Sequence, residues 1–238
     1  VNPDKVCNFD CPYCQVDRTV PPRDKAVDFD IMVAEIDGLL AMAASGAIWQ
    51  HPKFADTPEQ YRRVNDIAFA GDGEPTTYAC LGEAIREVKR LREKHGLAEA
   101  KIIVLTNALL LNRPEVMEAL SELRHGPYEI WAKLDAGTQE YFEFIAGRKL
   151  SLQRVVDNIA QAGKQLELTI QSLFPTVDGN DPGEDEYAAY AGRINEITAA
   201  GANLRLLQLY TTARRPAQDR IGMIDDARMD EIGAFIAS

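Results

Sequence analysis

The run Cys7-Asn8-Phe9-Asp10-Cys11-Pro12-Tyr13-Cys14 places three of the four cysteines of the chain within eight residues. Thiolates are metal ligands, and three of them in so short a loop can converge on one metal centre. Disulfide pairing would leave one of the three over, with only Cys80 available as its partner. The C-x3-C-x2-C spacing also differs from that of a zinc ribbon or a ferredoxin. The run therefore predicts a loop built around a metal centre.

Three kinds of site compete for these cysteines. A zinc site needs four ligands and usually takes them from two spaced pairs. Its fourth ligand would come from elsewhere in the chain, namely from Cys80, His51, His95 or His125. A redox pair of Cys11 and Cys14 would leave Cys7 unexplained. We favour an iron–sulfur cluster because it uses all three thiolates.

A second segment, Gly71-Asp72-Gly73-Glu74-Pro75-Thr76, follows the short apolar run of residues 67–70. A glycine-rich turn after a strand is by itself an ordinary tight turn. Glycine also permits close approach of the chain to a ligand. Glu74 offers a carboxylate that can offset an ammonium group, whereas the proline beside it favours a structural role. Both roles for Glu74 stay open at this point.

Taken together, the cysteine run and this turn resemble the radical S-adenosylmethionine (SAM) superfamily. In that family the same cysteine spacing holds three irons of a 4Fe–4S cluster, and the fourth iron stays open for SAM. The resemblance implies that Cys7, Cys11 and Cys14 are metal ligands. The resemblance extends to Tyr13, the aromatic residue before the last cysteine, and to the turn at residues 71–75, which matches the family's GGE segment. It therefore implies a SAM site that includes Tyr13, Gly71, Asp72, Gly73, Glu74 and Pro75.

Length and composition fit a soluble globular protein. We expect one α/β domain over residues 1–238, with part of its first strand upstream of Val1. No apolar run approaches the roughly 20 residues that cross a bilayer. Clustered cysteines favour a reducing compartment, so we expect the cytoplasm. A net charge of −11 disfavours nucleic acid as a partner.

Strand-like apolar runs alternate with helical patterns along the chain. The expected strands are residues 67–70, 101–106, 129–134, 166–171 and 203–210, and the expected helices are residues 28–44, 80–95, 114–124, 138–145, 151–162, 184–200 and one beginning near 225. Such alternation predicts a parallel sheet with right-handed crossovers. It does not separate a doubly wound sheet from an open barrel. The resemblance implies the latter, a partial (βα)6 TIM-like barrel with the cysteines in the loop after the first strand.

Polar residues follow the strands, where chemistry gathers in barrels of this type. The candidates for SAM binding are Thr106, Asn107, Asp135, Gln171, Gln208 and Tyr210. Helix capping is the competing role for Asn107 and Asp135, since a helix follows each of them. Asn180 and the adjacent Arg214 and Arg215 are candidates for substrate binding, the arginines for an anionic group.

The resemblance also implies a reaction. A reduced cluster would cleave SAM to methionine and a 5′-deoxyadenosyl radical, which takes hydrogen from an unidentified small-molecule or peptide substrate. An electron donor such as flavodoxin or ferredoxin would supply the electron. The segments NPDKVCNFDCPYCQVDR, FAGDGEPT and LQLYTTARRPA resemble the tRNA wyosine-synthesis branch of these iron–sulfur oxidoreductases.

Two alternatives remain open for the reaction. The first is modification of an RNA base, which a basic rim of Arg148, Lys149, Arg214 and Arg215 would support. The second is a non-catalytic iron–sulfur or zinc-binding module. That module would explain the cysteines but not the turn at residues 71–75.

Overall fold

Five parallel strands form the central sheet, in the order β1-β2-β3-β4-β6. The structure is a computed structural model that describes residues 1–216 and 218–238. The strands are β1 (Asp66–Phe69), β2 (Lys101–Thr106), β3 (Tyr128–Lys133), β4 (Leu168–Leu173) and β6 (Leu204–Tyr210). This arrangement is consistent with the predicted partial TIM-like barrel. One domain over residues 1–238 stays a prediction.

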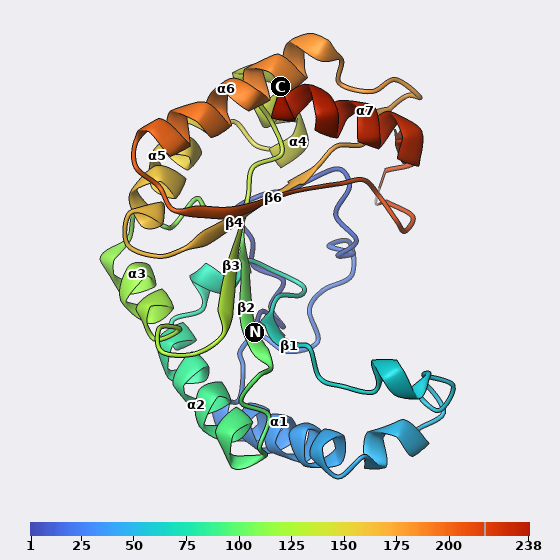
Figure 1. The fold of residues 1–238 in the computed structure, drawn as a ribbon, viewed down its shortest axis with the longest axis vertical. Coiled ribbons are helices and arrows are strands. Elements are labelled where there is room, and N and C mark those ends of the chain that lie inside the picture. Colours follow the sequence, from blue (N-terminus) through green and yellow to red (C-terminus); the bar gives the residue numbers. More distant parts are fainter. Residues whose placement is uncertain (217) are drawn as a thin grey trace.

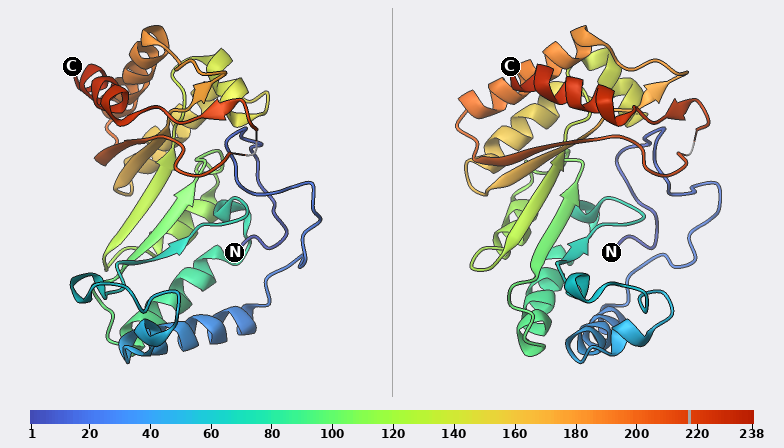
Figure 2. Two further views of the ribbon diagram at one scale, coloured as in Figure 1. Left: turned by 90° about the vertical axis from the view of Figure 1, so that its right-hand side faces the viewer. Right: turned by 45° about the vertical axis from the view of Figure 1, so that its right-hand side comes forward.

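Helices cover the outer side of the sheet. They are α1 (Phe29–Ala44), α2 (Leu81–Lys94), α3 (Pro114–Ser121), α4 (Gln139–Ala146), α5 (Leu152–Gly163), α6 (Glu184–Ala199) and α7 (Asp226–Ala237). Figure 1 shows these helices along the convex side of a crescent, and Figure 2 shows residues 1–28 running along the side that the helices leave open. Among the described residues, no helix has the length and apolar character needed to span a membrane.

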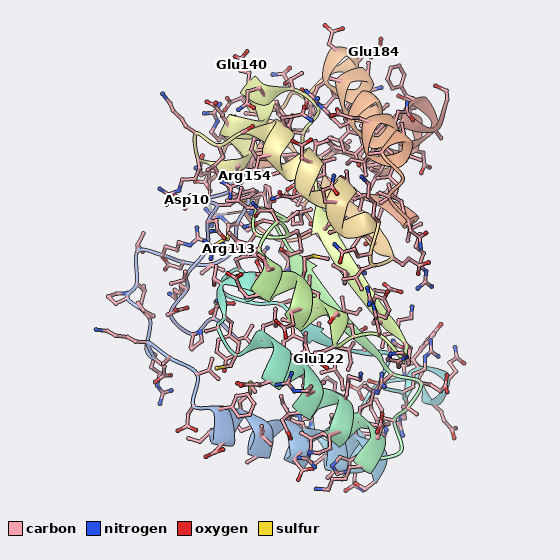
Figure 3. The ribbon with its side chains drawn as sticks, turned by 90° about the vertical axis from the view of Figure 1, so that its left-hand side faces the viewer. Asp10, Arg113, Glu122, Glu140, Arg154 and Glu184 are labelled. Carbon is pink, nitrogen blue, oxygen red and sulfur yellow. The ribbon has the colours of Figure 1, made fainter. Side chains whose placement is uncertain are left out.

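Burial on both faces accounts for the nearly continuous apolar run of β2, and β4 is buried along its whole length. Every residue of β4 is buried, and α5 presents Val155, Val156 and Ile159 to the sheet side of the core. Strands of a parallel sheet are covered on both faces in this way. Figure 3 is turned to the helical layer, where the labelled Arg113 and Glu122 lie at the two ends of α3. Glu122 accepts a hydrogen bond from Arg86 of α2 at 2.8 Å, which joins these two helices.

Capping residues in the sequence explain where several helices begin and end. Asp28 caps α1 by accepting a hydrogen bond from the Ile31 amide, and Pro114 takes the first turn of α3. Gly96 follows α2 with φ of +68°, the left-handed conformation that glycine adopts without strain. A short 3-10 helix at Glu59–Tyr61 follows Pro58.

Some expected boundaries were wrong. Residues 1–6 form no strand, because Lys5 turns the chain with φ of +58° and donates its amide to the Asn2 carbonyl. β4 begins at Leu168 rather than 166, since the Leu166 amide still bonds to Ala162 at the end of α5. α3 ends at Ser121 rather than 124. The two-residue strands β5 (Thr176–Val177) and β7 (Ile221–Gly222), which pair antiparallel, were not expected.

Candidate functional site

The three clustered cysteines line one cavity of about 210 Å³ at the carboxyl ends of the strands. The strand ends contribute the opposite wall. Besides Cys7, Cys11 and Cys14, the lining includes the expected residues Tyr13, Gly71, Gly73, Glu74, Pro75, Thr106, Asn107, Gln171 and Tyr210, and the unexpected residues Phe9, Arg18, Ala70, Leu105 and Lys133. Most of the residues that the sequence singled out therefore meet in one place.

Gly73 brings the turn after β1 against the start of the cysteine loop. The Glu74 amide donates to the Val6 carbonyl at 2.9 Å. A Cβ atom on Gly73 would lie 2.3 Å from that same carbonyl oxygen and 2.5 Å from the Asn2 Cβ. Since real Cβ atoms essentially never approach so closely, only glycine lets these two segments pack.

Gly147 makes a second contact of this kind at the end of α4. The Asp10 amide donates to the Ala146 carbonyl at 2.8 Å, and a Cβ atom on Gly147 would lie 2.0 Å from the Asp10 carbonyl oxygen. In Figure 3 the loop that carries the labelled Asp10 reaches the edge of the helical layer. Two glycines, one on each side, thus fix the backbone of the cysteine loop.

Glu74 is buried and its carboxylate is fully engaged by the protein. One oxygen accepts hydrogen bonds from the Thr76 amide, the Thr76 hydroxyl and the Thr106 hydroxyl, and the other accepts one from the Asn107 amide at 2.8 Å. Burial raises the pKa of Glu74, although the hydrogen bonds act in the opposite direction. The carboxylate therefore ties the turn after β1 to the end of β2, which is the structural role left open by the sequence.

Asn107 combines a local turn with a contact to the cysteines. Its side-chain oxygen accepts from the Leu109 amide at 3.1 Å, and its side-chain nitrogen donates to the Cys7 sulfur at 3.8 Å. Asn107 does not cap α3, because Arg113 occupies that position. Ala108 has φ of +62°, and Asn158 donates to its carbonyl oxygen at 3.1 Å. This strained backbone orients Asn107 toward the cavity.

Asp135 does not cap a helix, since Thr138 caps α4. Its carboxylate instead accepts hydrogen bonds from the Tyr13 hydroxyl at 2.5 Å and from the Leu173 amide at 2.8 Å. It also lies 3.2 Å from the Lys133 ammonium. Asp135 therefore connects the cysteine loop to the ends of β3 and β4.

Lys133 is one of the charged cavity residues that the sequence reasoning missed. It donates to the Tyr210 hydroxyl at 2.8 Å, and its ammonium lies 5.5 Å from the centre of the Tyr13 ring and 5.0 Å from that of Tyr210. A signal was available, because Glu129, Trp131 and Lys133 alternate along β3 and so share one face. Polar residues at alternate positions of a parallel strand indicate a face that borders a cavity.

The remaining candidates lie around the central cavity or apart from it. A second cavity of about 680 Å³ is lined by Asp72 and Arg214 and shares Tyr13, Cys14, Gly71 and Tyr210 with the first. Gln208 accepts a hydrogen bond from Gln171 at 3.2 Å.

The substrate-binding candidates are not brought together. Arg215 lines a third cavity of about 500 Å³ and pairs with Asp219, whereas the neighbouring Arg214 lines the second cavity. Asn180 lies in the turn after β5, where its side chain donates to the Asp178 carbonyl. It lines none of these three cavities.

The cysteines have the chemistry of a cluster site. All are free thiols, and Cys80 stands apart at the start of α2. In the part of the chain that the structure describes, no three His, Cys, Asp or Glu side chains are arranged around a single ion. The three thiols nevertheless line the same cavity. Burial raises the pKa of Cys7, and that of Cys11 to about 12, so metal binding must release protons.

Comparison with known proteins identifies the family. A model described as the radical SAM superfamily matches residues 1–185. The chain belongs to this superfamily. Radical SAM proteins are enzymes, and membership implies SAM and an iron–sulfur cluster.

Two solved structures have a similar fold. A radical SAM methyltransferase from Sphaerobacter thermophilus matches with a TM-score of 0.62 and 16% identity, over 98% of this chain and 60% of that one. TYW1 with a lysine–pyruvate adduct bound matches with a TM-score of 0.56 and 15% identity, over 97% of this chain and 69% of that one. At this level of identity, the likeness concerns the fold alone.

Two curated relatives match by sequence. The GTPase Obg of Brachyspira hyodysenteriae is 23% identical over 238 residues, which is 97% of this chain and 30% of that protein. The UPF0026 protein slr1464 of Synechocystis is 34% identical over 115 residues, which is 48% of this chain and 35% of that protein. The chain thus matches about a third of the length of each.

Proposed function

We propose that this radical SAM enzyme holds a 4Fe–4S cluster on Cys7, Cys11 and Cys14. When bound and reduced, the cluster supplies one electron that breaks a carbon–sulfur bond of SAM, giving methionine and a 5′-deoxyadenosyl radical that takes hydrogen from the substrate. One observation carries the proposal. Three free thiols line the same cavity as the carboxyl ends of the parallel strands.

The cavity wall offers groups suited to a polar cofactor such as SAM. Gly71 presents backbone without a side chain, and nothing lies within 4 Å of the position that its Cβ would take, which allows close approach of a ligand. Thr106, Asn107 and Gln171 add hydrogen-bonding side chains from the ends of β2 and β4. Glu74 holds this wall together rather than binding the cofactor, because its oxygens are already engaged.

The second cavity is the proposed entrance for the substrate. It meets the cysteine cavity at Tyr13, Cys14, Gly71 and Tyr210, and its volume of about 680 Å³ is within the usual range of small-molecule sites. Arg214 on its wall is exposed and makes no ion pair within the described residues. We infer that it receives an anionic group of a small molecule or peptide.

A separate protein is proposed as the electron donor. The sequence has one cysteine outside the triplet, too few for a second cysteine-ligated cluster. A one-electron carrier such as flavodoxin or ferredoxin is the class expected, in a reducing compartment such as the cytoplasm.

Modification of an RNA base is the weaker candidate. The basic rim that would support it is partly neutralised, since Arg148 lies 4.0 Å from Asp10 and Arg215 lies 2.8 Å from Asp219. With a net charge of −11, little positive surface is left for phosphates.

The experiment is anaerobic reconstitution with iron and sulfide, followed by reduction, addition of SAM and chromatography of 5′-deoxyadenosine. We expect deoxyadenosine from the wild type and from Cys80→Ala, but not from Cys11→Ala. The Cys80 variant is the matched control because this thiol lies outside the cavity. A fully loaded protein that neither binds nor cleaves SAM would refute the proposal and favour an electron-transfer module. Bound zinc in place of iron would indicate a structural site.

A further inference from the structure

Lys133 and Asp135 form a buried ion pair in the wall of the site. Their charged atoms lie 3.2 Å apart, and the side chains are only 17% and 6% exposed. No other ion pair among the described residues has two partners buried so deeply. Most of the remaining pairs are on the surface, where an ion pair contributes little.

The pair is held in place from several elements. Asp135 accepts from Tyr13 in the cysteine loop and from the Leu173 amide at the end of β4. Lys133 donates to Tyr210 at the end of β6 and lies between two aromatic rings. Burial acts to lower the pKa of Lys133, but Asp135 and Tyr210 hold it above its usual value, so the ammonium stays charged.

Stability alone does not explain such a pair. Removing two charges from water is expensive, and well-packed apolar residues in their place are often as stable or more so. The position of the pair suggests another reason. Lys133 borders the cavity that the three cysteines line. Asp135 accepts a hydrogen bond from Tyr13, which lies in the cysteine loop between Cys11 and Cys14.

We propose that Lys133 and Asp135 are positioning residues that set the electrostatic environment of the cluster. The inference rests on the proposed function, since it needs a cluster on the three cysteines. Reduction adds a negative charge to the cluster. The Lys133 ammonium stabilises that charge and the Asp135 carboxylate opposes it, because the reduction potential of a cluster follows its local charge. The two residues therefore act on the potential in opposite directions.

The test is a potentiometric titration of the reconstituted cluster, followed by electron paramagnetic resonance. Lys133→Met should shift the midpoint potential to more negative values, and Asp135→Asn should shift it to more positive values. Lys133→Arg keeps the charge and should restore a potential near that of the wild type. A general loss of packing would not move the two variants in opposite directions.

Glu129→Gln is the matched control. Glu129 is also an acid on β3 in a partly buried pair, with Lys101 at 2.6 Å. It precedes Lys133 by four residues, which places it about 13 Å away along a strand that rises roughly 3.3 Å per residue. Since the interaction of two charges weakens with distance, this variant should change the potential much less than Lys133→Met or Asp135→Asn.

Each outcome either supports the inference or overturns it. Potentials that stay unchanged in the Lys133 and Asp135 variants, or that move in the same direction, overturn it while leaving the proposed function intact. A wild-type protein that takes up no cluster overturns both. If the charge variants fail to fold, Tyr13→Phe replaces them, because it removes one hydrogen bond from Asp135 and leaves a more concentrated negative charge. It should then shift the potential to more negative values, and an unchanged value overturns the inference.

Discussion

Replacing Gly147 by alanine should displace the cysteine loop. Gly147 ends α4 with φ of +64°, and the new Cβ would lie 2.0 Å from the Asp10 carbonyl oxygen, where ordinary contact begins at 3.4 Å. The loop must therefore retreat by about 1.4 Å, the difference between these distances. The left-handed conformation costs an alanine roughly 1–2 kcal/mol. Distortion of the hydrogen bond from Asp10 to Ala146 adds about 1 kcal/mol. Because Cys11 follows Asp10 directly, iron binding should suffer as well.

Gly96→Ala is the control that separates strain from displacement. Gly96 has φ of +68°, but an added Cβ there would meet nothing within 4 Å. Both variants are compared by urea unfolding of the cluster-free protein and by iron content after anaerobic reconstitution. Gly96→Ala should lose only the roughly 1–2 kcal/mol of strain and load iron normally. Gly147→Ala should lose about 1 kcal/mol more and load less iron. Equal stability of the two variants together with wild-type iron content in Gly147→Ala would refute the reasoning.

Two further predictions concern stability. Glu74→Ala leaves two buried donors, the Thr106 hydroxyl and the Asn107 amide, without their acceptor, and at about 1–3 kcal/mol per unsatisfied group it should destabilise by at least about 2 kcal/mol in urea unfolding. Asp37 joins α1 to α2, and hydrogen bonds from Lys94 and His95 hold its pKa below the usual value. A carboxyl group whose pKa is lower in the folded protein stabilises the fold at pH values above its unfolded pKa of about 3.9. This stability is lost as the pH falls through the folded pKa. Asp37→Asn should therefore flatten the acid side of a plot of melting temperature against pH, and an unchanged acid side would contradict the assignment.

Local patterns in the sequence predicted much of the fold. The β-branched run at 101–106 is β2 to the residue, and the caps at Asp28 and Pro114 mark two helix starts. The parts that were missed depend on contacts between distant segments. β5 and β7 have two residues each and pair Thr176 with Gly222. They are too short to show the alternation of apolar and polar residues by which a strand is recognised in a sequence.

The site was predictable where topology forces residues together. Carboxyl ends of parallel strands share one edge, so Asn107 after β2 and Gln171 of β4 are brought to the same cavity. The Tyr13–Asp135 hydrogen bond joins residues 122 positions apart, and no local pattern indicates it. Arg214 and Arg215 follow β6 at a bend in the chain and line different cavities although they are adjacent, which no sequence pattern indicates.

The cysteine loop owes its position to the sheet and helices around it, because residues 6–14 contain no helix or strand of their own. Gly73 holds its start, Gly147 holds its middle and Asp135 holds Tyr13 near its end. These three contacts come from the turn after β1, from α4 and from the end of β3. Ligands held this way need little rearrangement to receive a cluster. A variant that relaxes one of these contacts should thus impair iron binding before it unfolds the protein, and Lys133 supports the third contact because its ammonium lies 3.2 Å from the Asp135 carboxylate.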